Sequence, residues 1–132
     1  MERFLDSFER CLGKPEFLEV FYDRFLASSD EVAEKFRNTD FKRQRRMLKT
    51  SLIAMVAVLA KRSADLSELQ SAADSHGRHG LDIRPQLYEL WLDNLVLAVS
   101  TCDERYTLEL GGLWREAMQP GIDYMTSRWA KQ

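Results

Sequence analysis

The chain has 132 residues, a mass of 15.4 kDa, and 45% hydrophobic and 30% charged residues. That length and composition fit one globular domain, assigned to residues 1–132, and exclude a disordered or fibrous protein. The net charge of -2 and the pI of about 5.7 exclude a general attraction to nucleic acid or to an anionic membrane.

The cellular compartment is predicted from the apolar segments and the cysteines. The longest strongly apolar stretch, Leu52 to Ala60, is much shorter than the roughly 20 residues of a membrane-spanning helix. The N-terminal sequence MERFLDSFER is acidic and amphipathic, unlike a secretory signal. Cys11 and Cys102 form no CxxC pair and are predicted to be small core or semi-buried residues. We therefore expect a cytoplasmic protein with no membrane or nucleic-acid partner.

In the first forty residues, apolar side chains recur at helical spacing. The stripe from Phe4 to Leu12 predicts a first helix, which Gly13 ends before Pro15 starts the next. A second stripe runs from Phe17 to Leu26 and ends at residues 28–29. Asp30 is then predicted to be the N-cap of a short helix that reaches Phe36, followed by the loop RNTD.

The remaining segments are also helical in pattern, and none shows the clean alternation of a strand. A long helix is predicted over residues 41–60, a shorter one over 65–75, another after Arg84-Pro85, and a last one over 106–129, kinked at Pro120. The fold class is therefore all-α. The long helix starts with a basic run, which is usually a solvated helix face and otherwise a nucleic-acid or partner patch: Lys42, Arg43, Arg45, Arg46 and Lys49.

Both histidines lie in one glycine-dense stretch, DSHGRHG, at residues 74–80. The chain has no phosphate-binding glycine loop, HExxH motif, CxxC pair or obvious Ser-His-Asp arrangement. A lone histidine at a helix end is most often a surface or capping residue. Neutral imidazole is also a good ligand for iron, so the stretch has a second interpretation.

Several separated segments resemble a single-domain bacterial globin. FYDRFL (residues 21–26) followed by EVAEKF (residues 31–36) is similar to the second globin helix and its entry to the haem corner. QRRML (residues 44–48) is similar to the start of the distal helix, and SHGRHGL (residues 75–81) to the proximal segment. The resemblance implies a globin fold of about six to eight helices around haem b, iron protoporphyrin IX.

The same resemblance implies roles for individual residues. His76 is the implied iron ligand, with Ser75 fixing its tautomer. Gln44 and Tyr22 are the implied hydrogen-bond donors to bound oxygen, and His79 the implied propionate contact. One or two residues of the basic run are alternative propionate contacts. Five apolar residues are implied to line the haem pocket: Phe36, Leu48, Leu52, Leu81 and Leu87.

The residues alone leave alternatives open. His79, nine positions before Tyr88, is a second candidate iron ligand. Tyr22 is equally well explained as a core tyrosine, and Gln44, in a polar run, as a solvent-exposed residue. Trp129 and Leu92 are predicted exposed apolar residues that would suit a contact between copies, although the oligomeric state cannot be inferred.

The resemblance implies reversible binding of oxygen, nitric oxide and carbon monoxide. Any enzymatic activity would be the dioxygenation of nitric oxide to nitrate, and it would need an external electron donor because no reductase domain is present in 132 residues. A haem-based sensor or partner-binding module is the alternative function. A haem-free helical domain that binds nucleic acid is disfavoured by the acidic pI.

Overall fold

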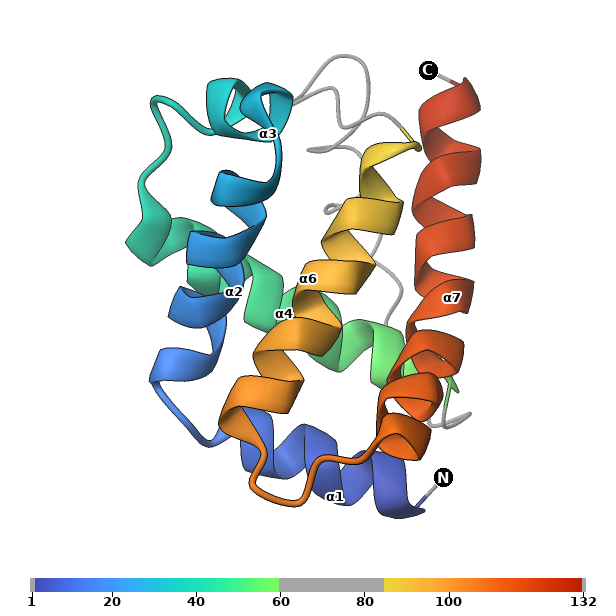
Figure 1. The fold of residues 1–132 in the computed structure, drawn as a ribbon. Coiled ribbons are helices and arrows are strands. Elements are labelled where there is room, and N and C mark those ends of the chain that lie inside the picture. The colour runs from blue at the N-terminus through green and yellow to red at the C-terminus, as the bar shows by residue number, and fades with distance from the viewer. Residues whose placement is uncertain (1, 60–84, 132) are drawn as a thin grey trace. The chain divides into compact units, whose positions relative to one another are not determined.

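The computed structural model describes residues 2–59 and 85–131, apart from the side chains of residues 58 and 128–131. In these ranges the backbone forms helices and no strand, as Figure 1 shows, which confirms the predicted all-α class. The helices are α1 (Glu2–Leu12), α2 (Glu16–Ser28), α3 (Asp30–Lys35), α4 (Phe41–Leu59), α6 (Leu87–Cys102) and α7 (Leu108–Lys131). None of these helices combines the length and the apolar character needed to cross a membrane.

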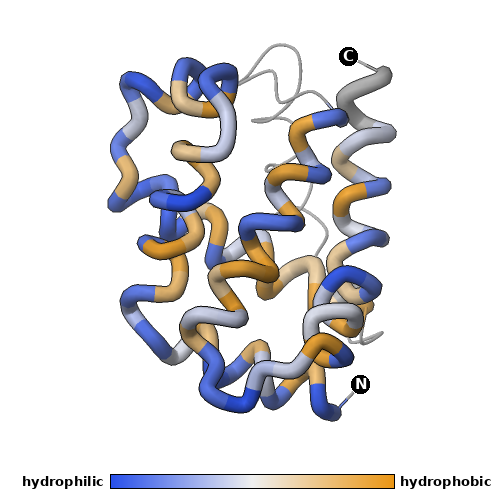
Figure 2. The backbone as a smooth tube through the Cα atoms, in the orientation of Figure 1, coloured by the Kyte–Doolittle hydropathy of each residue, from blue (hydrophilic) through white to orange (hydrophobic). Residues whose placement is uncertain are grey.

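The chain divides into two compact units, each built from two separate stretches of sequence. The first unit comprises Met1–Asn38 and Leu90–Ala117, and the second comprises Thr39–Glu89 and Met118–Gln132. Helices α6 and α7 each contribute residues to both units. Along the helices, apolar and polar residues follow one another in short patches, as the colours of Figure 2 show, which is the pattern of amphipathic helices around a core.

The core of the first unit is aromatic and centred on Trp114 of α7, which is fully buried. Phe4 meets the Trp114 ring edge-on at a centroid distance of 5.1 Å, and Phe8 and Phe17 lie at 5.9 and 6.1 Å. These rings belong to the apolar stripes of α1 and α2 that the sequence predicted. Their burial stabilises this unit by roughly 25 cal/mol per Å² of apolar surface.

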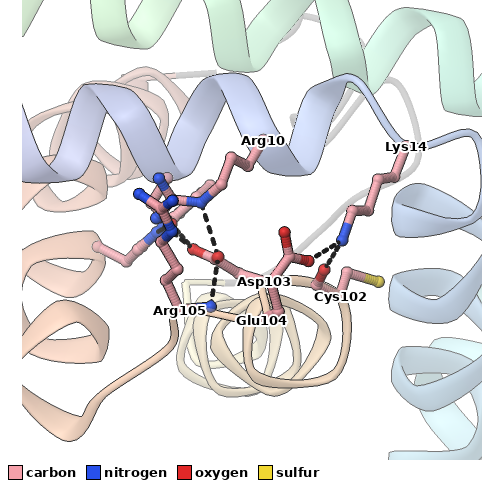
Figure 3. A network of polar contacts seen from close by, with 8 residues as sticks. Arg10, Lys14, Cys102, Asp103, Glu104 and Arg105 are labelled. Atoms are coloured by element: carbon pink, nitrogen blue, oxygen red, sulfur yellow. Dashed lines mark hydrogen bonds and ion pairs between the residues drawn. The ribbon is translucent and has the colours of Figure 1, made fainter.

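A buried polar network joins α1 to the turn between α6 and α7 (Figure 3). The Asp103 carboxylate accepts hydrogen bonds from Arg10 Nε at 2.8 Å and Arg10 Nη2 at 3.0 Å. It also accepts from Ser7 Oγ at 2.6 Å and from the backbone N–H of Arg105 at 3.0 Å. Trp114 Nε1 in turn donates to Ser7 Oγ at 2.9 Å. The N-terminal helix is therefore tied to residues about a hundred positions later.

The two cysteines flank this network, and both are buried and unbridged, which confirms the sequence prediction. Burial raises the pKa of the Cys11 thiol to about 12. Beside Cys102, the Lys14 ammonium donates to the carbonyl oxygen of Cys102 and pairs with the Glu104 carboxylate at 2.6 Å. Neither thiol is placed to react as a thiolate near neutral pH.

Two sequence predictions about local structure were wrong. Ser29, not Asp30, is the N-cap of α3: its extended backbone and its Oγ, which accepts from the backbone N–H of Val32, place Asp30 inside the helix. Leu92 is only 8% exposed, because α6 buries residues around most of its circumference rather than along one stripe. The Trp129 side chain lies outside the described part of the chain.

In the second unit, α4 and the C-terminal part of α7 approach closely. The buried face of α4 includes Leu48, Leu52, Met55 and Val56. A Cβ atom added at Gly121 would lie 2.7 Å from Met55 Cγ, so only glycine fits there without a shift of Met55. The α7 helix continues through Pro120, one residue before this approach.

Candidate functional site

In the first unit, the predicted residues Tyr22 and Phe36 lie in an aromatic cluster. Their ring centroids are 6.0 Å apart in an edge-on arrangement, and the side chains are 5% and 4% exposed. Phe25, one turn along α2 from Tyr22, lies 6.2 Å from the Phe36 ring. Phe36 is the C-cap of α3, where its backbone N–H donates to the carbonyl of Val32. The short α3 helix thus places Phe36 against α2.

In the second unit, Gln44 and Leu48 lie one turn apart on the buried side of α4. Asp40 starts this helix, because its carboxylate accepts from the backbone N–H groups of Lys42 and Arg43 at 3.1 and 3.4 Å. Gln44 is 8% exposed and Leu48 7%. The structure therefore rejects the solvent-exposed alternative for Gln44.

The side-chain amide of Gln44 forms no hydrogen bond within the described part of the chain. A buried amide without a partner costs about 1–3 kcal/mol relative to one that is hydrogen-bonded. Buried polar groups in native proteins nearly always have partners, so an orphaned amide needs an explanation such as a ligand. Gln44 is therefore available as a donor to a small molecule held beside α4.

Leu87 and its neighbour Tyr88 are buried at the start of α6, each 4% exposed. Burial raises the pKa of Tyr88 well above its usual value, so its hydroxyl stays protonated in the folded protein. That hydroxyl donates to Met125 Sδ of α7 at 3.8 Å. Tyr88 thus fixes the first turn of α6 against α7 within the second unit.

The proposed iron ligand cannot be placed, because His76, His79 and Leu81 lie outside the described residues. They include both histidines of the chain, so the described ranges contain no imidazole. Within those ranges no three histidine, cysteine, aspartate or glutamate side chains gather as a metal site. The choice between His76 and His79 stays a prediction.

Sequence reasoning did not single out Phe25 as part of the Phe36 environment. Its signal was present, since Phe25 follows Tyr22 by three positions and so belongs to the same helical face. Tyr22, Phe25 and Phe36 therefore form one aromatic cluster, whereas the haem contact implied for Phe36 stays a prediction.

One solved structure is similar to this chain over almost its whole length. It is the crystal structure of the Pseudomonas aeruginosa PAO1 protein PA3967, described as structurally highly homologous to a human haemoglobin. The two chains are 37% identical, the match covers 97% of this chain and 96% of that one, and the TM-score is 0.85. No protein-family model and no curated protein matches the chain.

The helical fold, the aromatic cluster and this similarity define a haemoglobin-like protein. The chain belongs to the single-domain bacterial globins.

Proposed function

We propose that this globin binds haem b on His76 and reversibly binds oxygen, and that it also binds nitric oxide and carbon monoxide. The observation that carries the proposal is the side-chain amide of Gln44, which is buried on α4 at the position that the globin resemblance assigns to the distal side and has no hydrogen-bond partner among the described residues. Haem, when bound, supplies an iron with one open position for a diatomic gas.

The protein side chains would control how the gas is held. The Gln44 amide donates a hydrogen bond toward the gas molecule and stabilises its partial negative charge in a low-dielectric pocket. Leu48, buried one turn further along α4, excludes water from that space. Within the first unit, Tyr22 and Phe36 pack against each other, and the globin resemblance assigns them the roles of hydrogen-bond donor and haem contact.

The test of haem binding is the ultraviolet–visible spectrum of the purified protein, recorded as isolated and after dithionite and carbon monoxide. We expect a strong haem band that shifts with carbon monoxide and is lost in His76→Ala but kept in His79→Ala. The absence of a haem band after addition of haem would falsify haem binding, and loss only in His79→Ala would move the ligand assignment to His79.

The role of Gln44 is tested by the rate of oxygen release from Gln44→Leu, measured by stopped flow. A hydrogen bond to a charged acceptor is worth about 1.5–3 kcal/mol, so release should become roughly 10- to 100-fold faster. Gln119→Leu is the matched control, because Gln119 lies on the surface and bonds only to Asp123 within the described residues, at 2.8 Å. Equal rates in wild type and Gln44→Leu would show that Gln44 does not contact the gas.

Dioxygenation of nitric oxide to nitrate is the catalytic activity that we propose for the same site in the cytoplasm. It requires an external electron donor to return the protein to its starting state. The measurement is nitrate formed per protein when nitric oxide is mixed with oxygen-equilibrated protein. No nitrate above the haem-free background would leave gas binding without catalysis.

A further inference from the structure

A surface pocket in the first unit is lined by three arginines. Its volume is about 240 Å³, and its lining residues are Arg3, Asp6, Arg10, Arg105 and Leu110. Arg3, Asp6 and Arg10 lie on one face of α1, spaced three and four positions apart. Arg105 comes from the turn between α6 and α7. Segments about a hundred positions apart in the sequence therefore bring three guanidinium groups to one concavity.

The Asp103 carboxylate holds two of these arginines in place. Its Oδ1 atom accepts both from Arg10 Nε and from the backbone N–H of Arg105, so one buried group orients α1 and the turn together. Figure 3 shows the Arg10 and Arg105 side chains next to each other, and both line the same pocket. Two like charges that line one pocket favour a bound anion.

The three arginines face three carboxylates, Asp6, Asp103 and Glu109, but the pairing is uneven. Arg10 uses two donors on Asp103 and keeps its others. Arg3 pairs with Glu109, but these side chains are 59% and 69% exposed, and such a pair is weak. The Arg105 side chain has no hydrogen bond or ion pair within the described residues.

We infer that this pocket binds a small phosphate-bearing anion, either inorganic phosphate or a phosphate ester. Guanidinium groups bind phosphate oxygens through paired N–H donors, and the pocket is smaller than the roughly 300–1,000 Å³ typical of drug-sized ligands. Asp6 would favour phosphate over sulfate. A carboxylate accepts a hydrogen bond from a protonated phosphate oxygen, whereas sulfate carries no proton near neutral pH and is repelled.

The test is a nuclear magnetic resonance titration of the full-length protein near pH 6.5 and at constant ionic strength. The probes are inorganic phosphate, glycerol phosphate and sulfate. We expect saturable shifts of backbone amides in residues 3–10 and 103–110 with phosphate. The tighter of the two phosphate probes identifies the free anion or the ester as the preferred form.

The variants separate this site from general anion binding. Arg105→Gln should weaken phosphate binding at least about tenfold, since it removes the guanidinium that has no ion-pair partner among the described residues. Arg115→Gln is the control with the same charge change, because Arg115 pairs with Asp93 on the surface and does not line the pocket. Asp6→Asn should bring sulfate affinity close to that for phosphate. Equal phosphate binding by wild type and Arg105→Gln, or wild-type sulfate affinity equal to that for phosphate, overturns the inference.

Discussion

Replacing Asp103 by Asn is expected to destabilise the protein by about 3 kcal/mol. Burial raises the pKa of the Asp103 carboxyl, but the hydrogen bonds from Arg10, Ser7 and the backbone of Arg105 outweigh it and hold the pKa down to about 2. The shift from the ordinary value near 3.8 corresponds to roughly 2 kcal/mol of stability. The asparagine NH₂ group cannot accept the hydrogen bonds that the carboxylate oxygen accepts, and the lost bonds account for the remaining destabilisation.

The assay is urea and thermal unfolding of the wild type and Asp103→Asn between pH 2 and pH 7. For a chain of this length, 3 kcal/mol lowers Tm by roughly 10 °C. Because folding lowers the pKa, the charge contributes fully above pH 4, the ordinary range of an aspartate, and is lost as pH falls toward 2. The difference between the two proteins should therefore shrink over that interval.

Asp93→Asn is the control for a general effect of removing a surface charge. Asp93 is 48% exposed and pairs with Arg115 at 2.8 Å, so its loss should cost less than about 1 kcal/mol. If Asp103→Asn costs no more than this control, Asp103 does not stabilise the fold through its charge. A cost that is the same at pH 2 as at pH 7 would exclude that role as well.

Two further predictions concern packing and thiol chemistry. Gly121→Ala should destabilise the protein by about 1–2 kcal/mol, because the new Cβ displaces the buried Met55. The same change at Gly112, where nothing lies within 4 Å, should stabilise it by up to about 1 kcal/mol. Urea unfolding compares the two variants, and changes of the same sign in the free energy of unfolding would contradict the close approach of Gly121 to Met55. Cys11, with its pKa raised to about 12, should resist iodoacetamide at pH 8 in the native protein and react in urea. Mass spectrometry locates the label, and fast labelling of Cys11 in the native protein would contradict its burial.

The sequence predicted helices well because helical periodicity is a local signal. The stripes from Phe4 to Leu12 and from Phe17 to Leu26 became α1 and α2. The cap of α3 was misplaced by one residue because serine and aspartate are equally good caps. Leu92 was misjudged because α6 is apolar around most of its circumference, so no single stripe marks its buried side.

The residues of the candidate site were predictable only where the resemblance to a family aligned them with known positions. Gln44 lies in a run of basic residues, and its periodicity alone does not distinguish a buried amide from a solvated one. The contact of Asp103 with Ser7 and Arg10 had no sequence signal, because it joins residues more than ninety positions apart. The three-arginine pocket depends on that contact and was equally invisible.

The discontinuous composition of the first unit has a consequence for biosynthesis. Ser7 finds its partners Asp103 and Trp114 only 96 and 107 positions later. At a translation rate of about 5–20 residues per second, the tryptophan that covers the phenylalanines of α1 and α2 is synthesised roughly 5–20 s after them. During that interval the nascent chain exposes aromatic side chains that later become buried. Ribosome-associated chaperones would bind this exposed surface, and overexpression would favour inclusion bodies.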